Sequence, residues 1–310
     1  MSIWTPGSWI STSQAFSWEK CPASYWFQRV LKIPVPDRTY FIIGGELHRV
    51  VQRQLTLKRD RLPLLSETEV TELIQKDMAL LLATAPDGTP LVKYGKDETP
   101  EIVVEDTIAL AHVWMREVLP QIVPVSIELK IGPEDGLRLP ESGTPVRCVI
   151  DLIDADACIV DLKSSTSKWS DGDAEKRLQT IIYSWAFRVL YGMPPGAFRY
   201  DVLIRKKRCK SRTTAKAEYQ PIRFTPEPLL EFGALRRFEA IVEQMRLERY
   251  YPITGSQCHE CPFEEFCGRH FASLPFASCP ATAPSAPAEG PRYLCAGKTD
   301  RNLPTVKEKP

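Results

Sequence analysis

A short acidic hairpin is the feature that most constrains how this chain can fold. Residues 149–153 and 159–163 are apolar runs rich in β-branched side chains, and the link between them, residues 154–157, is polar. Two such runs on either side of turn residues predict an antiparallel hairpin. A turn centred on Asp156 would place Asp151 opposite Asp161, on the same face of the sheet.

Side chains alternate along a strand, so Lys163 is expected on the face of Asp161. The opposite face is expected to enter a core, and it consists of Ile150, Leu152, Val160 and Leu162. Two carboxylates with a few water molecules suit Mg²⁺ or Mn²⁺, which prefer oxygen ligands, and a neighbouring lysine can orient a water molecule at such an ion. The alternative is a hairpin whose charged face is simply solvated.

The remaining periodic segments predict a mixed α/β protein. Helices are expected over 68–82, 101–118 and 227–247, in a segment that opens at Gly44–Gly45 and carries His48 in its first turn, and in a segment capped by Asp173 and closed by Gly192. Alternating residues predict strands over 125–131, 198–205 and 217–224. Glu128 in the first of these could face the cleft of Asp151, or it could be a solvated edge residue.

The chain has nine cysteines, a net charge of +1 and no apolar run that approaches the length of a membrane span. An odd number of cysteines favours a reducing compartment and metal or cluster ligation over a disulfide framework. The first residues lack the basic start and apolar stretch of a signal peptide, so we expect a cytoplasmic protein without membrane association. The small net charge means that any nucleic-acid binding must come from a local patch.

Three cysteines near the C-terminus have the spacing of metal ligands, Cys258-x₂-Cys261-x₅-Cys267. A fourth ligand is needed, and the candidates are Cys21, Cys148, Cys158, Cys209, His259 and His270. Residues 1–272 are expected to form one domain. Residues 273–310 are rich in Ala, Pro and Ser and are expected to be disordered.

The densest basic segment follows the strand 198–205 and contains Lys206, Lys207, Arg208, Lys210 and Arg212. A hairpin tip of this composition can grip phosphates, or it can be a solvated loop.

Taken in order, the motifs resemble those of PD-(D/E)XK nucleases of the RecB-like exonuclease group, in the iron–sulfur branch that includes the AddB nuclease domain and CRISPR-associated exonucleases. The resemblance covers about residues 8–270. It rests on a Ser-x-Ser…Cys-Pro-x-x-Tyr opening at residues 11–25, Gly44-x-x-x-His48, Asp151, Asp161-Leu162-Lys163, Gln179-x-x-x-Tyr183 and the cysteines at 258, 261 and 267. One departure is Cys148, which stands where the family usually has glycine and which could narrow the approach to DNA.

The resemblance implies a restriction-endonuclease-like core, a central mixed sheet flanked by helices. It also implies a metal-dependent DNA exonuclease that acts on ends or single strands, in DNA repair, recombination or defence. Mg²⁺ or Mn²⁺ would be held by His48, Asp151, Asp161 and the Leu162 carbonyl. Lys163 would act on the attacking water, while Gln179 and Tyr183 would position the scissile strand and the lysine.

The resemblance further implies that Cys21 is the fourth ligand of a 4Fe–4S cluster, which would join the N- and C-terminal segments. Four thiolates also suit zinc, and the sequence alone leaves that alternative open. The chain has no helicase motif, so either it works alone or a helicase or recombination partner supplies the motor. A non-catalytic DNA-binding clamp of the same fold is the competing function, and a zinc-stabilised structural protein is a weaker one.

Overall fold

The computed structural model describes residues 8–84, 91–206, 208 and 214–272. The chain divides after Cys267 into one unit of residues 1–267 and a second of residues 268–310. The expected domain boundary after residue 272 stays a prediction, because the expected tail, residues 273–310, lies outside the described residues. None of the described helices combines the length and apolarity that a bilayer crossing requires.

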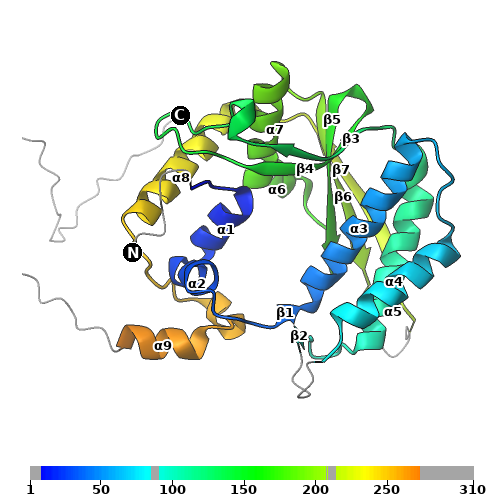
Figure 1. Cartoon of the computed structure of the whole chain (residues 1–310), viewed down its shortest axis with the longest axis horizontal. Helices are drawn as coiled ribbons and strands as arrows, with labels where there is room; N and C mark the ends of the chain where they lie inside the picture. The colour runs from blue at the N-terminus through cyan, green and yellow to red at the C-terminus, as the bar shows by residue number, and fades with distance from the viewer. Residues whose placement is uncertain (1–7, 85–90, 207, 209–213, 273–310) are drawn as a thin grey trace, which may run out of the picture. The chain divides into compact units, whose positions relative to one another are not determined.

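A five-stranded mixed sheet in the order β3-β4-β5-β6-β7 forms the centre of the first unit (Figure 1). Its strands are β3 (Pro124–Ile131), β4 (Cys148–Asp154), β5 (Cys158–Ser165), β6 (Ala197–Arg205) and β7 (Ala217–Phe224). All pairs are antiparallel except β5 and β6, which are parallel. This is the expected restriction-endonuclease-like core with helices on both sides.

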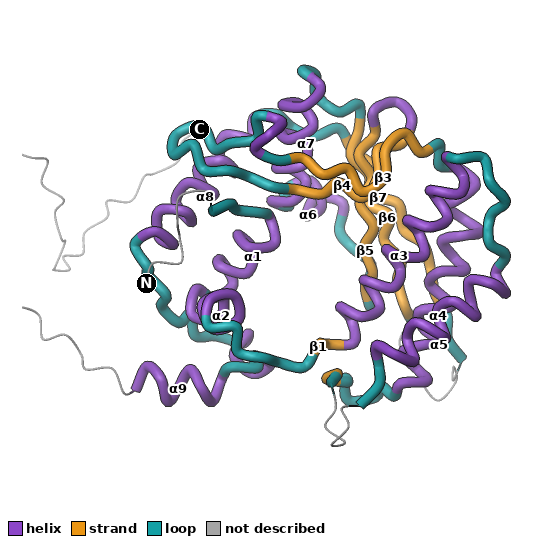
Figure 2. Tube along the Cα trace, viewed as in Figure 1, coloured by secondary structure: helices purple, strands orange, loops and turns teal. Residues whose placement is uncertain are grey.

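Three helices cover one face of the sheet: α3 (Thr39–Arg59), α4 (Glu67–Leu81) and α5 (Pro100–Val113). Their buried residues, such as Leu47, Val50 and Leu110, form one core with Leu152 and Leu203 of the sheet. The short strand β1 (Asp37–Arg38) directly precedes α3 (Figure 2) and pairs in parallel with β2 (Val92–Lys93), which follows α4.

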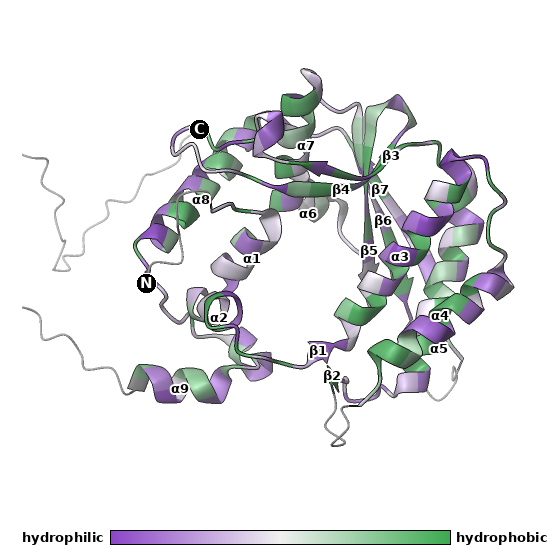
Figure 3. Ribbon diagram, in the orientation of Figure 1, coloured by the Kyte–Doolittle hydropathy of each residue, from purple (hydrophilic) through white to green (hydrophobic). Residues whose placement is uncertain are grey.

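The other face is covered by α1 (Thr12–Lys20), α6 (Asp171–Glu175), α7 (Leu178–Tyr191) and α8 (Leu229–Arg246). Ile182, Phe187 and Phe238 belong to this second core, together with Tyr200 and Val202 of β6. Figure 3 shows green and purple residues alternating along α8, as expected of a helix with one buried and one exposed side. Among the described residues, the remaining α-helices are α2 (Pro22–Tyr25) and α9 (Glu264–Ala272), which adjoin or carry cysteines.

Most predicted elements are confirmed, but two helix boundaries were predicted wrongly. Helix α3 begins at Thr39, so Gly44 and Gly45 lie inside it and His48 lies in its third turn. The helix expected from a cap at Asp173 is interrupted. Asp173 lies inside α6, and α7 starts afresh after Arg177, whose backbone is extended. Gly192 closes α7 as expected, with a left-handed φ of 71°.

Candidate metal-dependent nuclease site

The hairpin forms with the predicted register, and its two strands part at the acidic residues. Leu152 pairs with Val160, which is the register that a turn at Asp156 requires, and the ladder between β4 and β5 ends there. Beyond this pair, the Leu162 N–H donates a hydrogen bond to Asp151 Oδ2 at 3.0 Å. A carboxylate therefore takes the place of a strand partner, and it is held at the point where β4 and β5 separate.

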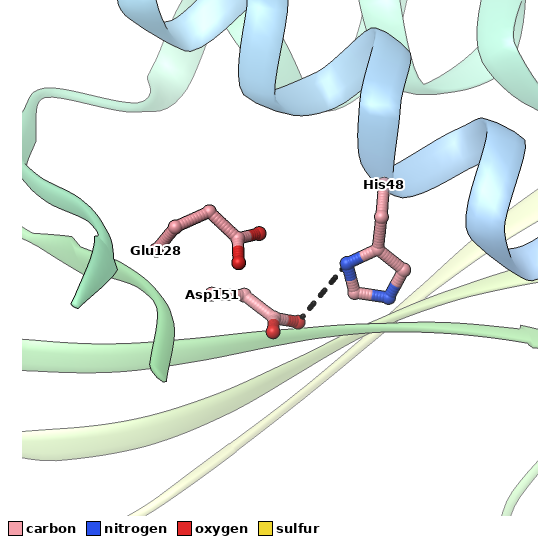
Figure 4. Close-up of side chains that lie close together, drawn as sticks. All are labelled: His48, Glu128 and Asp151. Carbon is pink, nitrogen blue, oxygen red and sulfur yellow. Dashed lines mark ion pairs between the residues drawn. The ribbon is translucent and has the colours of Figure 1, made fainter. Parts of the chain in front are cut away.

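Asp151 is one of three side chains that gather potential ligand atoms. One donor atom from each of His48, Glu128 and Asp151 lies within 4.8 Å of the others, and His48 Nδ1 lies 3.6 Å from Asp151 Oδ2 (Figure 4). The three residues come from α3, β3 and β4. An imidazole with two carboxylates is a donor set that suits Mn²⁺, and Mg²⁺ also binds through one or two carboxylates. The residues therefore fit a divalent cation.

Glu128 reaches this group through an unusual backbone conformation. Its φ is 49°, a left-handed value for a residue in the middle of a strand that is not glycine. Ile127 pairs with Leu152 and Leu129 pairs with Ile150, but no pair with β4 is formed at Glu128 itself. A left-handed residue of this kind costs about 1–2 kcal/mol, so a strained conformation holds a carboxylate beside Asp151.

Asp161 and Lys163 form a second, more deeply buried group next to the first. Asp161 is fully buried, and Lys163 Nζ lies 2.5 Å from its Oδ2. Within the described residues, no other donor reaches this oxygen. Asp161 Oδ2 therefore keeps lone pairs available for a cation.

Helix α7 supplies the other contacts of Asp161. Gln179 Nε2 donates to Asp161 Oδ1 at 2.8 Å and approaches the Tyr183 hydroxyl oxygen at 3.0 Å. The two residues are four positions apart and so lie one turn apart on the same side of the helix. Asp161, Gln179 and Tyr183 form a continuous polar chain. The sequence pattern predicted the shared helix side of Gln179 and Tyr183 but not their link to Asp161.

Burial controls the protonation of this site. It raises the pKa of Asp161 to about 6, although the adjacent Lys163 ammonium lowers it. Burial also raises the pKa of Asp151, against the lowering influence of His48 and Lys163. The pKa of the Tyr183 hydroxyl is raised by burial and by both aspartates, so this group stays protonated and can donate a hydrogen bond. A cation that replaced the missing solvation would favour both carboxylates in their charged form.

In the structure, Glu128 joins the expected metal ligands, and Asp161 belongs to a neighbouring group. His48 and Asp151 are brought together as predicted, but Glu128 completes their group, while the oxygens of Asp161 face Lys163 and Gln179. The sequence placed Glu128 on a strand but could not separate a ligand from a solvated edge residue. The assignment of the Leu162 carbonyl stays a prediction, since the described contact of Leu162 is made by its N–H.

Two expectations about this hairpin need correction. Ile150 was expected to share a core with Leu152, but it packs into the core of α7 and α8, on the other face of the sheet. The parting of the strands at Asp151 interrupts the alternation. Cys148, at the usual glycine position, is only 6% exposed, and burial raises its pKa to about 12. Its side chain points into the core and does not narrow a path for DNA.

The four cysteines of the expected cluster lie close to one another. Cys21 Sγ accepts from the Ile253 N–H at 3.5 Å, and Cys258 Sγ lies 3.8 Å from the Ile253 carbonyl oxygen. Burial raises the pKa of Cys267, and the nearby thiols of Cys21, Cys261 and Cys258 raise it further. Two of the alternative ligands, Cys148 and Cys158, are buried in the sheet, and Cys209 lies outside the described residues.

The basic segment after β6 is only partly described. Lys206 pairs with Glu218, and Arg208 pairs with Glu105 and Asp106, both at 2.9 Å. Lys207, Lys210 and Arg212 lie outside the described residues. The described contacts join two of the five basic side chains to carboxylates, so the proposed grip on phosphates stays a prediction.

Comparison with known families now identifies the chain. The model of the PD-(D/E)XK nuclease superfamily matches residues 10–268. The chain belongs to the PD-(D/E)XK nuclease superfamily. This membership supports a nuclease, and it agrees with the fold and with the acidic site described above.

Sequence comparison with curated proteins gives no match. Among solved structures, one described as "Putative exonuclease" from Eubacterium rectale shares 12% identity and has a TM-score of 0.47, over 82% of this chain and 86% of that one. LHK-Exo in complex with dAMP also shares 12% identity, with a TM-score of 0.26 over 64% and 85% of the two chains. At these TM-scores, neither structure carries an argument about this protein.

Proposed function

We propose that the protein is a Mg²⁺- or Mn²⁺-dependent deoxyribonuclease of the RecB-like group that cleaves DNA at ends or in single strands. The observation that carries this proposal is the convergence of His48, Glu128 and Asp151 beside the Asp161–Lys163 pair. In a nuclease superfamily, such a donor set next to an ammonium group suits the hydrolysis of a phosphodiester.

Each side chain has a role that its contacts support. His48, Glu128 and Asp151 would hold a divalent ion, with Asp161 as a further oxygen donor. Such an ion lowers the pKa of a bound water molecule and neutralises charge on the phosphate. The Lys163 ammonium would orient the attacking water, whose oxygen forms the new bond to phosphorus as the bond to the leaving sugar oxygen breaks.

Gln179 and Tyr183 would organise the site from α7. Gln179 fixes Asp161 through the 2.8 Å hydrogen bond, which keeps the carboxylate aimed at Lys163. The protonated Tyr183 hydroxyl can donate to an oxygen of the phosphate. Both contributions are electrostatic and depend on burial, since a hydrogen bond in a low-dielectric site is stronger than one in water.

We further propose that Cys21, Cys258, Cys261 and Cys267 bind a 4Fe–4S cluster. The thiols of Cys21, Cys258 and Cys261 are close enough to Cys267 to raise its pKa, so the four sulfurs lie near one another. Four thiolates suit either zinc or an iron–sulfur cluster. The resemblance of the motif order to the iron–sulfur branch favours the cluster.

A cleavage assay tests the nuclease proposal. End-labelled single- and double-stranded DNA would be incubated with Mg²⁺ or Mn²⁺ and wild type, Asp161→Ala or Lys163→Ala. We expect products only with wild type, and their ladder gives the polarity of digestion and the need for ends. DNA binding without cleavage by wild type would instead support the non-catalytic clamp, and equal cleavage by all three proteins would refute the assigned site.

The metal content of protein purified under anaerobic conditions tests the cluster. We expect a brown protein with broad visible absorption and equal amounts of iron and acid-labile sulfide. A colourless protein with one zinc ion per chain would exclude the cluster.

A further inference from the structure

Two aromatic side chains stand exposed at the start of α3. Tyr40 is 47% and Phe41 63% exposed, and their ring centroids lie 4.4 Å apart with an interplanar angle of 47°. The next two residues, Ile42 and Ile43, are buried in the core beneath the helix. The helix is thus anchored through its isoleucines, while both rings form one apolar surface on the outside.

This surface lies on the side of α3 that leads to the metal donors. Phe41, Gly45 and His48 are spaced by four and then three positions, so they line up along one side of the helix. The seven residue steps from Phe41 to His48 span about 10 Å along the helix axis. His48 in turn lies 3.6 Å from Asp151. The aromatic pair and the candidate site are therefore continuous along one helix.

Glycine keeps the stretch between them open. A Cβ atom added at Gly45 would meet nothing within 4 Å, and one at Gly44 would make only an ordinary contact, 3.8 Å from Ser164 Oγ. Glycine inside a helix is destabilising relative to alanine, and packing does not require it at Gly45. The bare backbone allows a bulky substrate to approach α3 closely between the rings and His48.

The start of α3 is also held firmly. Arg38 Nη1 pairs with Glu260 at 3.0 Å, and Glu260 lies between the cysteines 258 and 261. The Thr39 hydroxyl donates to Glu98 at 2.5 Å, and Arg205 pairs with the same carboxylate at 2.6 Å. Figure 1 shows α3 beginning beside β1, at the end of the helix that these contacts secure. The rings therefore project from a fixed backbone.

We propose that Tyr40 and Phe41 form a stacking platform for the bases of single-stranded DNA, whose backbone then passes over Gly45 to the donors at His48. This inference rests on the proposed nuclease function and names the form of DNA that the site takes. Aromatic side chains stack on bases of any sequence, and only unpaired bases offer a free face. Because the net charge is only +1, the overall field attracts phosphates weakly, and stacking supplies a larger share of the affinity.

Binding of a fluorescein-labelled oligothymidine, measured by anisotropy with Ca²⁺ in place of Mg²⁺, tests the platform. The double variant Tyr40→Ala/Phe41→Ala should bind about 10- to 100-fold more weakly than wild type. Phe232→Ala is the matched control, since Phe232 is an equally exposed aromatic residue on α8, at 68%, and this variant should bind like wild type. The single variant Phe41→Trp, with Tyr40 unchanged, should bind like wild type, because tryptophan also stacks on bases.

The Gly45→Leu variant tests the path independently of the rings. The open space at Gly45 and the better helix propensity of leucine should leave the melting temperature unchanged or higher, while oligothymidine affinity and cleavage fall. Unchanged affinity of both the double variant and Gly45→Leu would overturn the inference, as would a wild type that binds no single-stranded DNA. A wild type that binds but never cleaves with Mg²⁺ would reject the proposed function and leave the binding comparison intact.

Discussion

The metal-donor site and the cysteine group are held in different ways. His48, Glu128 and Asp151 come from a long helix and two strands of the central sheet, and they converge through the packing of those elements. Cys21 follows α1, Cys258 lies in a short helical turn (Ser256–Glu260), Cys261 directly follows that turn, and Cys267 lies in α9. All four are partly exposed. The first group is positioned by the fold, whereas the second group joins segments that are distant in sequence.

This difference predicts opposite responses to the loss of a ligand. Removing the divalent ion should leave the fold intact, because hydrogen bonds and core packing already place the donors. Losing the proposed cluster should loosen the structure, since Cys21 and Cys258 are 237 positions apart and their joint ligation would close a very long loop.

The largest expected effect is on stability and comes from the cysteines. Cys258→Ser should remove the cluster and lower the free energy of unfolding by about 4–5 kcal/mol, by analogy with a disulfide that closes a long loop. Denaturant titration under anaerobic conditions measures this. Cys158→Ala, a buried thiol outside the group, is the control and should cost only about 1 kcal/mol. If Cys258→Ser and Cys158→Ala lowered the free energy of unfolding equally, the cysteine group would have no special role in stability.

The next effect is on catalysis. Lys163→Met keeps the length of the side chain but removes its charge, and it should slow cleavage by about 10²- to 10³-fold, as expected when a charge-stabilising donor is lost. The melting temperature at neutral pH should also fall, because Lys163 is the charge partner of the buried Asp161. Single-turnover rates on labelled DNA measure the slowing, with Lys168→Met as the control, since Lys168 is 64% exposed and pairs with Glu218. A comparable slowing by both variants would contradict a specific role for Lys163.

In the metal-free protein, the stability lost by burying an ionised Asp161 should depend on pH. The folded pKa of Asp161 is raised to about 6, so its stabilising contribution is complete below the unfolded value near 3.8 and is lost as the pH rises through 6. Asparagine does not ionise, so Asp161→Asn should lose no stability as the pH rises. It should be more stable than wild type at pH 7 by on the order of 1–3 kcal/mol. Melting curves in EDTA at pH 4 and pH 7 test this, and a difference that does not grow with pH would be inconsistent with the burial of an ionised Asp161.

The smallest expected effect concerns the backbone of Glu128. Glu128→Asn should stabilise the metal-free protein by about 1 kcal/mol, because asparagine tolerates a left-handed φ better than glutamate. Glu128→Gln keeps the strain and removes only the charge, so it isolates the contribution of the carboxylate to Mn²⁺ affinity. Calorimetry measures both quantities. If Glu128→Asn were no more stable than Glu128→Gln, the backbone at this residue would not be strained as described.

Local patterns predicted the strands, the hairpin register in which Leu152 pairs with Val160, and the spacing of Gln179 and Tyr183. These features depend on short-range periodicity, which the sequence shows directly. The start of α3 at Thr39 was missed because contacts of Thr39 with Glu98, far along the chain, fix that end of the helix. The break before α7 was missed because nothing in the apolar pattern requires the extended backbone at Arg177.

The candidate site was predictable only in part, because tertiary contacts place some of its residues. His48, Asp151, Asp161 and Lys163 were found through motif order, and the structure brings them together. Glu128 was placed on a strand, but its left-handed φ and its approach to Asp151 arise from tertiary packing. The side on which Ile150 packs depends on where the two strands part, and no single-strand periodicity contains that information.

Binding of Mn²⁺, followed by electron paramagnetic resonance on wild type and Asp151→Asn, tests the central claim most directly when cleavage of a labelled single strand is measured in the same samples. Asp151 touches both His48 and the Leu162 N–H, so its carboxylate is the common element of the site. We predict that wild type binds Mn²⁺ and cleaves, and that Asp151→Asn loses both while its fold persists. Mn²⁺ binding and cleavage at wild-type levels by Asp151→Asn would contradict the account.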